Sequence, residues 1–348
     1  MRNATRRIFC FVMVTIFLAM GGTKTRGASY EDYDNETRGW GLMTNTSHEV
    51  PINAGSEVFA DRRAYYYVNT QEKNIYLTFD CGYENGYTGK ILDVLKAEGV
   101  KALFFVTKPY IADNVDLVKR MKREGHLVGN HTCRHLSTPS LSPKEISQEL
   151  ADCAAYMREK TGYSMDRYFR PPMGEWSPRT LKVVQDLGYT TVFWSMAFMD
   201  YDVNQQPGAD AIKKQFLDYY HNGAIPLLHV ISESDTEALG SIIQEMKKKG
   251  YSFHTLCELA QKEQEHRLIL APRTSASNPV QAWVQGKKGD DNVRILYYRR
   301  NGEVLSEEPR EPGVYYVRAF VGGNSEYRPW VSAMKKFTIC RTRRHSSE

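Results

Sequence analysis

Residues 77–86 of the chain read Leu-Thr-Phe-Asp-Cys-Gly-Tyr-Glu-Asn-Gly, with Asp80 and Cys81 at their centre. The apolar residues before them, from position 74 to Phe79, form a run of the length and composition of a buried β-strand. A carboxylate and a thiol therefore stand at a predicted strand end. Catalytic side chains of α/β proteins collect at such ends. The stretch predicts an α/β domain that carries Asp80 at its functional edge.

Short apolar runs alternate with amphipathic segments on both sides of this stretch. The predicted strands cover residues 75–79, 102–106, 126–129, 168–169, 190–194, 224–229 and 251–254. The predicted helices cover residues 89–98, 115–124, 143–160, 178–187, 210–220 and 236–249. Ser142, Pro143 and Glu145 form a helix start of the capping-box type. About seven β/α repeats over residues 71–262 favour a distorted (β/α)7-type barrel, although a doubly wound sheet has the same periodicity.

The pattern changes after Leu259. Residues 263–278 are first charged and then rich in Ser, Pro and Asn, which predicts a linker. Four β-type runs follow, at 280–284, 294–298, 313–320 and 336–339, and they predict a small all-β sandwich over residues 279–340. A basic tail, 341–348, ends the chain. Residues 313–319, together with Trp283, resemble a strand signature of bacterial immunoglobulin-like (Ig-like) modules, which implies either adhesion to wall polymer or a spacer.

The first 28 residues indicate where the protein works. Three arginines precede an uncharged apolar run at residues 8–20, and two glycines follow it. This order is typical of a secretory signal peptide, and the run is shorter than the ~20 residues that span a bilayer. We expect a cleaved signal peptide or an uncleaved N-terminal anchor, and an extracytoplasmic protein that is secreted or held at the cell wall. We expect membrane contact only through this segment, and a polar lead-in at 29–70.

The overall composition is that of a globular protein, with 41% hydrophobic and 25% charged residues among 348. The formal net charge of +5 is small and gathers partly at the two ends of the chain. Neither end interleaves aromatic with basic residues, so we expect no nucleic-acid binding. The cysteines that follow Cys10 are odd in number and match no disulfide scaffold. The sequence predicts no particular oligomeric state.

Three further groups of reactive side chains follow predicted strands. His131 and His135 are four residues apart, a spacing that places two imidazoles on one face of a helical turn, as in zinc sites. Arg170 precedes two prolines, and His229 ends an apolar strand. Each group alone has a structural interpretation: a solvated histidine pair, a turn cap at Asp80, a core histidine. Together they favour metal-assisted hydrolysis.

Each group matches a step in the hydrolysis of an acetamide. Asp80 suits a general base, and His229 suits the acid that donates a proton to the departing nitrogen. The guanidinium of Arg170 can hold a carboxylate in a bidentate fork, either that of Asp80 or one on the substrate. The two prolines fix a loop in which the backbone N–H of Met173 can face an oxyanion.

Residues 74–259 resemble the polysaccharide deacetylase family, the carbohydrate esterases that remove acetyl groups from chitin, peptidoglycan and xylan. The five short motifs of that family occur in order as Thr78-Phe79-Asp80, His131-x-x-x-His135, Arg170-Pro171-Pro172, Asp200 and Leu227-x-His229. Within the family, residues 76–87, the Arg-Pro-Pro-x-Gly motif and residues 191–198 are similar to the muramic δ-lactam deacetylases of spore-forming bacteria.

The resemblance implies a role for each motif. It implies Asp80 as the catalytic base, His229 as the acid, and His131 and His135 as ligands of a divalent metal. The other residues that we expect at the site are Arg170, Met173, Trp194, Asp200 and Leu227. In this scheme Asp200 orients His229 or Arg170, Leu227 lines the pocket for the acetyl methyl group, and Arg170 also reads the lactyl carboxylate of muramic acid.

The implied substrate is the N-acetylmuramoyl residue of peptidoglycan glycan strands, deacetylated for δ-lactam formation in the spore cortex. Two alternatives stay open. One is deacetylation of N-acetylglucosamine in peptidoglycan or chitin, and the other is a non-catalytic wall-binding protein.

Position 81 departs from the wider family, in which a second Asp serves as the third metal ligand. The δ-lactam deacetylases also lack that Asp, so the departure agrees with the closer resemblance. Cys81 has three possible roles: a thiolate ligand that favours a soft metal such as zinc, a partner for Cys133, or simple packing. Without it, His131 and His135 form a two-histidine site completed by water.

Overall fold

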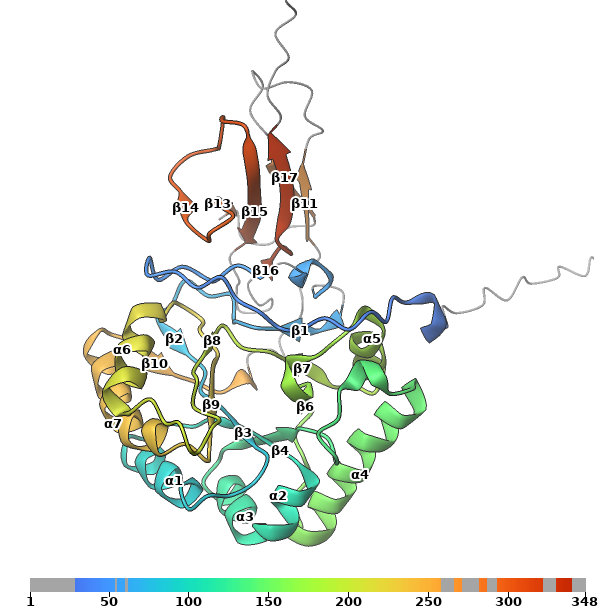
Figure 1. Ribbon diagram of the computed structural model, residues 1–348, viewed down its shortest axis with the longest axis vertical. Helices are drawn as coiled ribbons and strands as arrows, with labels where there is room; N and C mark the ends of the chain where they lie inside the picture. The colour runs from blue at the N-terminus through green and yellow to red at the C-terminus, as the bar shows by residue number, and fades with distance from the viewer. Residues whose placement is uncertain are drawn as a thin grey trace, which may run out of the picture.

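The computed structural model describes residues 29–53, 55–59, 62–257, 266–270, 282–286, 293–321 and 330–339. The predicted signal peptide or anchor at 1–28 and the basic tail at 341–348 lie outside these ranges, as does most of the predicted linker at 263–278. Figure 1 shows an α/β domain, coloured from blue to light orange, with an all-β module in orange and red at one end. Within the described ranges, no helix is long and apolar enough to cross a membrane.

The α/β domain is built on one sheet of eight strands, in which every neighbouring pair runs parallel. Their order across the sheet is β1 (Ala64–Tyr65), β7 (Thr190–Val192), β6 (Tyr168–Phe169), β5 (Leu127–Asn130), β4 (Leu103–Val106), β3 (Thr78–Cys81), β9 (Pro226–His229) and β8 (Met196–Ala197). A second sheet pairs β2 (Asn74–Ile75) with β10 (Ser252–Phe253). The prediction of a distorted (β/α)7-type fold is confirmed, as a curled half-barrel.

The helices lie around the outside of this sheet (Figure 1). They are α1 (Thr88–Ala97), α2 (Lys108–Asp113), α3 (Val115–Arg123), α4 (Pro143–Thr161), α5 (Pro178–Asp186), α6 (Ala209–Tyr219) and α7 (Glu233–Lys248). The predicted start of α4 is confirmed, because Ser142 and Glu145 form a capping box with Pro143 in the first turn. Helix α2 is absent from the predicted set, because six residues are too few to display a helical period.

The lead-in differs from the prediction of an irregular polar segment. Its strand β1 adds to the edge of the large sheet beside β7. Trp40 stacks on Phe193 with ring centroids 4.4 Å apart, and its indole Nε1 donates to the carbonyl oxygen of Trp194 (3.0 Å). Phe59 and Tyr66 belong to the same buried cluster. Scattered aromatic residues anchor this segment, and scattered residues show no period in the sequence.

The all-β module consists of two antiparallel sheets. One pairs β11 (His266–Leu270) with β12 (Ala282–Gly286). The other contains β14 (Val304–Leu305), β13 (Val293–Arg299), β15 (Gly313–Val321), β16 (Trp330–Val331) and β17 (Lys335–Ile339). Leu268 of β11 packs with Val317 and Ala319 of β15, so the sheets face each other as a sandwich. Strand β11 falls inside the predicted linker, which corrects that boundary: the buried Leu268 makes residues 266–270 part of the module.

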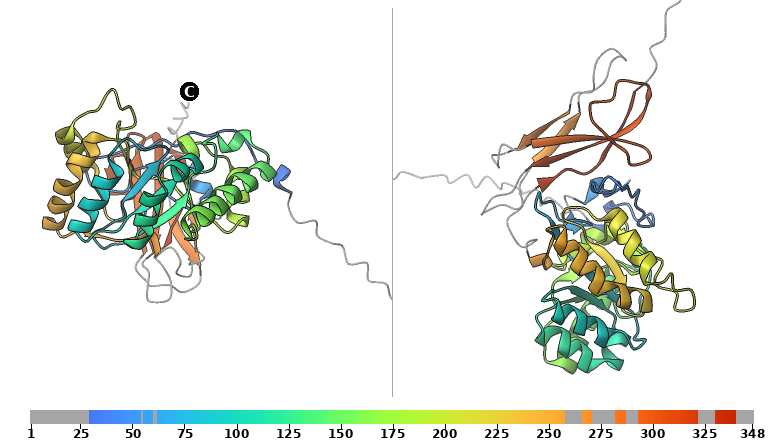
Figure 2. Two further views of the ribbon diagram at one scale, coloured as in Figure 1. Left: turned by 90° about the horizontal axis from the view of Figure 1, so that it is seen from below. Right: turned by 90° about the vertical axis from the view of Figure 1, so that its left-hand side faces the viewer.

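The module packs against the lead-in of the α/β domain, as the right-hand view of Figure 2 shows. Phe320 of β15 shares an apolar cluster with Tyr66, and Tyr298 of β13 shares another with Ile52. All four side chains are buried. The described part of the module is therefore joined to the α/β domain through apolar contacts, in addition to the chain connection.

Candidate active site

The reactive side chains predicted from sequence meet at one edge of the large sheet. Asp80 lies in β3, His131 follows β5, Arg170 follows β6, and His229 ends β9. All of these strands run parallel, so their carboxyl ends share an edge. Asp80 and His229 are direct neighbours in the register of β3 and β9.

Asp80 is held by Arg170. The guanidinium Nη1 donates to Asp80 Oδ1 at 2.8 Å, and the carboxylate is 8% exposed. Burial alone would raise the pKa of Asp80, but the positive charge of Arg170 outweighs it, with smaller contributions from His131 and His229, and the pKa is lowered. Asp80 is therefore ionised at neutral pH and has a second oxygen, Oδ2, that faces His131 Nε2 at 3.6 Å.

Arg170 itself is fully buried, and four of its donor positions are in use. Besides Asp80, it donates to Thr78 Oγ1 (2.8 Å) and to the carbonyl oxygens of Val192 and Phe193 (3.0 and 3.1 Å). Its guanidinium carbon lies 4.3 Å from the ring centroid of Phe105. This geometry corrects the expectation that Arg170 reads the lactyl carboxylate, because a fork enclosed by protein groups does not reach a substrate.

His131 and His135 form the candidate metal centre. Their ring centroids lie 4.8 Å apart, and His131 Nδ1 donates to the carbonyl oxygen of Arg170 at 2.9 Å. That bond leaves Nε2 of His131 unprotonated, which is the form that binds metals. Burial, opposed by the charge of Asp80, lowers the pKa of His131 to about 4, so the ring is neutral at physiological pH. The donor chemistry of the pair fits a divalent cation.

Within the part of the chain that the structure describes, a third protein ligand does not join these histidines. Among the described residues, no group of three or more His, Cys, Asp or Glu side chains is arranged to hold a metal ion. Cys81 is fully buried in the main core cluster with Ile91, Val106 and Tyr110, and burial raises the pKa of its thiol well above the usual range. Of the three roles considered for Cys81, packing is the one that this position fits.

The loop that carries the two histidines is strained and anchored. Thr132 and His135 have positive φ values of 69° and 54°, a conformation that costs energy outside glycine and often marks functional sites. Glu149 of α4, 4% exposed, accepts hydrogen bonds from the backbone nitrogens of Cys133 and Arg134, both at 2.9 Å, and from the side chain of Arg134. The loop therefore rests on a buried carboxylate.

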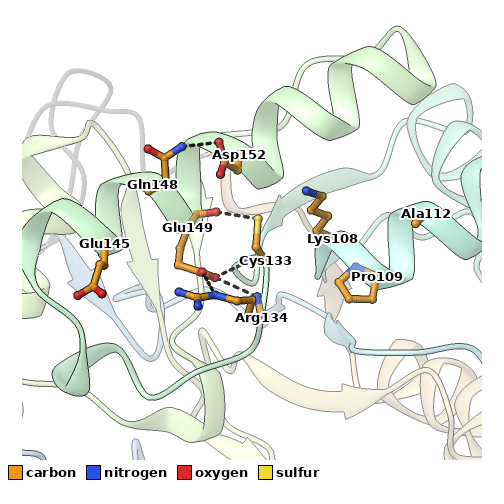
Figure 3. A pocket seen from close by; sticks show the side chains of 9 residues that line it. All are labelled: Lys108, Pro109, Ala112, Cys133, Arg134, Glu145, Gln148, Glu149 and Asp152. Atoms are coloured by element: carbon orange, nitrogen blue, oxygen red, sulfur yellow. Dashed lines mark hydrogen bonds and ion pairs between the residues drawn. The ribbon is translucent and has the colours of Figure 1, made fainter.

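Figure 3 shows the cavity of about 440 Å³ beside this anchor, between α2 and α4. Lys108, Cys133, Arg134 and Glu149 are among its lining residues. Asp80, Arg170 and His229 do not line it. We therefore place the chemistry at the sheet edge and treat this cavity as the far side of the histidine loop.

His229 pairs with Asp200, which follows β8. The imidazole Nδ1 donates to Asp200 Oδ1, and the backbone N–H of His229 donates to Asp200 Oδ2, both at 2.9 Å. Burial alone would lower the pKa of His229, but the hydrogen bond and charge of Asp200, aided by Asp80, raise it. Of the two roles expected for Asp200, the contacts match orientation of His229.

The remaining expected residues surround this centre. Leu227 is 6% exposed in β9, and Met173 follows the prolines with a φ of 59° and 57% exposure. The ring of Trp194 lies 5.6 Å from the guanidinium of Arg170. Gly174 has to be glycine here, because an added Cβ would approach the Trp194 ring to 2.7 Å.

An exposed apolar rim lies around the site. Six of the eight large apolar side chains that are exposed among the described residues fall on loops that follow β3, β5, β6 and β8. They are Tyr83, Leu136, Met173, Met199, Tyr201 and Val203. The ring of Tyr201 lies 6.1 Å from that of His229. Exposed apolar side chains that gather at one place are typical of a binding surface.

Three residues with evident contacts to the site are absent from the sequence prediction. Thr78 holds Arg170, Glu149 holds the histidine loop, and Asp235 of α7 lies within 3.3 Å of the backbone nitrogen of His229. Thr78 belongs to the motif Thr78-Phe79-Asp80, so its place at the site could have been predicted from the sequence. Glu149 and Asp235 lie on predicted helices, where an acidic residue indicates a solvated face or a cap and gives no signal of a site.

Comparisons with known proteins identify the family of the chain. Residues 67–192 match the family model described as polysaccharide deacetylase. The Bacillus subtilis protein named peptidoglycan-N-acetylmuramic acid deacetylase PdaA is 40% identical over 262 residues, which cover 74% of this chain and 97% of that protein. The solved structure of Bacillus subtilis PdaA, described as a family 4 carbohydrate esterase, is 41% identical with a TM-score of 0.63 and covers 65% of this chain and 97% of that one. A peptidoglycan-N-acetylglucosamine deacetylase of Bacillus cereus is 33% identical over 195 residues, which cover 55% of this chain and 90% of that protein.

Proposed function

Because the chain belongs to the polysaccharide deacetylase family, we propose that it hydrolyses the acetamide of N-acetylmuramoyl residues in peptidoglycan glycan strands. The observation that carries the proposal is the edge of the large sheet, where the Asp80–Arg170 ion pair faces a neutral histidine pair and a histidine–carboxylate pair. The relative named for N-acetylmuramic acid, matched over nearly its whole length, supports the choice of sugar.

In the proposed reaction Asp80 is the general base. Its Oδ2 takes a proton from the attacking water, while Arg170 keeps the carboxylate ionised and fixed in orientation. His229 is the general acid, and Asp200 raises its pKa, which favours the protonated imidazole that transfers a proton to the departing nitrogen. Asp200 aligns His229 through two hydrogen bonds. The two groups occupy neighbouring strand ends, so they can act on opposite sides of one carbonyl carbon.

His131 and His135 are the residues that would hold a divalent cation. When bound, such a cation supplies a Lewis acid beside the acetamide carbonyl. Zinc would suit two imidazole ligands, and water would complete the site, because no third protein ligand joins them among the described residues. The backbone N–H of Met173 is our candidate for a second contact to the oxyanion.

The exposed apolar rim is the proposed glycan-binding surface. Sugar rings present apolar C–H faces, and Tyr83, Tyr201 and Met173 offer exposed apolar area next to the catalytic groups. Leu227 and Trp194 are the candidates for the pocket of the acetyl methyl group. With Arg170 enclosed, the lactyl carboxylate of the substrate has to be read by other groups.

Export and biological setting are part of the proposal. We propose that the N-terminal segment carries the protein out of the cytoplasm as a signal peptide or an anchor, and that it acts on the cell wall or the spore cortex. There the freed muramoyl amine would close on the lactyl carboxylate to give the δ-lactam. The Ig-like nature of the C-terminal module, and wall adhesion through it, remain predictions.

Mass spectrometry of peptide-free peptidoglycan oligosaccharides, incubated with the protein lacking its first 28 residues and with added zinc, tests the proposal. We expect loss of acetyl groups from muramoyl residues alone, and no reaction with chitin oligosaccharides, which lack the lactyl group. Loss of acetyl groups from glucosamine would keep the mechanism and replace the substrate. No loss from either substrate would favour the wall-binding alternative.

A further inference from the structure

The general-acid side of the site contains a second buried carboxyl group that the proposed mechanism leaves unused. Asp235 is the third residue of α7 and is 2% exposed. Its Oδ2 lies 3.3 Å from the backbone nitrogen of His229, and Oδ2 of Asp200 lies 2.9 Å from the same nitrogen. The two carboxyl groups therefore meet at one backbone N–H.

Two carboxyl groups in such contact, away from water, cannot both be ionised, so one of them holds a proton. Asp200 accepts both the backbone N–H and the Nδ1–H of His229, and these bonds stabilise its negative charge. Asp235 has much less to stabilise a charge, since its Oδ1 is buried without a hydrogen-bond partner among the described residues. The proton therefore belongs on Asp235.

The directions in which the pKa values of the two carboxyl groups are shifted agree with this assignment. Burial, and then the neighbouring Asp200, raise the pKa of Asp235 well above its usual range. Burial would also raise the pKa of Asp200, but the hydrogen bonds from Asp235 and His229 lower it.

We infer that Asp235 is a positioning residue for the general acid: it stays protonated, donates its proton to Asp200, and so holds Asp200 ionised and aligned on His229. This inference rests on the proposed function, in which His229 is the acid. The charged or titratable groups that influence His229 from the surrounding elements are Asp80, His135, Arg170, Asp200 and Asp235. Among them, Asp235 acts through Asp200.

The pH dependence of kcat tests this role with three variants. Asp235→Ala removes the donor, so we expect kcat to fall at least about tenfold with KM nearly unchanged, and the alkaline limb of the profile to move to lower pH. Asp235→Asn keeps a neutral donor of the same shape and is expected to retain the profile of the parent. Glu233→Ala removes an exposed carboxylate from the same helical turn and serves as the control. Equal shifts in the Ala and Asn variants, or no shift in either, would overturn the inference.

Infrared difference spectroscopy decides the protonation state without turnover. We expect the parent, compared with Asp235→Asn at neutral pH, to show the carbonyl stretch of a buried carboxylic acid that the variant lacks. Absence of that band would overturn the inference whether or not the protein deacetylates glycans. Its presence in a protein without deacetylase activity would support the proton assignment and leave only the proposed function refuted.

Discussion

Two arginines are enclosed among the residues that the structure describes, and they lie in contrasting surroundings. Arg170, at the active-site edge, is 0% exposed and is paired with the carboxylate of Asp80. Arg318, in β15 of the C-terminal module, is 1% exposed and lies with its guanidinium 5.4 Å from the ring centroids of both Tyr66 and Tyr67. Its Nη2 donates to the hydroxyl of Tyr66, while Nε and Nη1 have no hydrogen-bond partner among the described residues.

The difference is that the charge of Arg170 has a role in the proposed reaction, whereas no such role is evident for the charge of Arg318. Burying a cation costs several kcal/mol unless an anion and hydrogen bonds compensate it. Arg170 has both, and its anion is the proposed catalytic base. Arg318 is stabilised by aromatic faces and the hydroxyl of Tyr66, so we expect it to contribute less to stability than an apolar side chain of similar length would. Burial of a charged side chain therefore does not by itself identify a functional residue. A buried charge that is paired with a proposed catalytic group does.

The largest effect is expected at Arg170. Arg170→Met leaves Asp80 buried without its partner, so we expect the free energy of unfolding to fall by about 3–5 kcal/mol. Deacetylation should fall by about 10²-fold or more, because the base loses both its orientation and its lowered pKa. Chemical denaturation and acetate release measure the two effects. An unchanged free energy of unfolding would show that the ion pair does not stabilise the fold, and would contradict the contrast drawn between the two arginines.

The interface around Arg318 is expected to matter through its apolar contacts. A chain that ends at residue 262 uncovers Ile52 and Tyr66, which Tyr298 and Phe320 help to bury. Full burial of one such side chain is worth about 1.5–3 kcal/mol, so we expect a loss of at least about 3 kcal/mol and a lower Tm. An unchanged Tm would mean that the module is a spacer with no structural role in the α/β domain.

Acid sharpens the contrast between the two arginines. The pKa of Asp80 is lowered in the folded protein, so its contribution to stability is present above its ordinary value of 3.8 and is lost as the pH falls through the folded value. We expect the parent and Arg318→Met to lose stability from this source on acidification, and Arg170→Met not to lose it. Denaturation curves at a series of pH values measure the difference. Equal losses in all three proteins would contradict the assigned partner.

The smallest effect is expected at Arg318. In Arg318→Met the hydroxyl of Tyr66 keeps its bond to the carbonyl oxygen of Pro51, at 3.2 Å in the parent. We expect stability to be unchanged or higher by up to about 2 kcal/mol, because apolar replacements of poorly compensated buried charges are often stabilising. A loss of more than about 2 kcal/mol, measured by denaturation, would show that the tyrosine faces compensate the charge fully.

The same two arginines show how much of the structure can be predicted from the sequence. Arg170 belongs to a motif beside a predicted strand end. Asp80 is one of the two partners that the sequence analysis gives it, and the other is a carboxylate on the substrate. Arg318 lies in a strand whose alternation gives no sign that a charged side chain faces inward, since its aromatic partners come from the lead-in, more than two hundred residues earlier. Contacts between segments that are distant in the sequence produce no periodic pattern in it.

The elements follow the same division. Helices α1, α3, α4 and α5 begin and end close to their predicted bounds, because their caps and apolar periods are local signals. Strands β1 and β11 are missing from the prediction, because β1 pairs with the distant β7 and Leu268 of β11 packs on the distant β15. At the site, Asp80, His131 and His229 follow from strand ends, whereas the contacts of Asp235 follow from the packing of α7.

The role of Asp80 is the central claim, and acetate release from peptide-free peptidoglycan oligosaccharides tests it most directly. The parent and Asp80→Asn, which keeps the shape of the side chain, are compared at neutral pH with equal added zinc. The account predicts steady release of acetate by the parent and a rate at least about 10²-fold lower in the variant, with both proteins folded. Equal rates in the two proteins would contradict it.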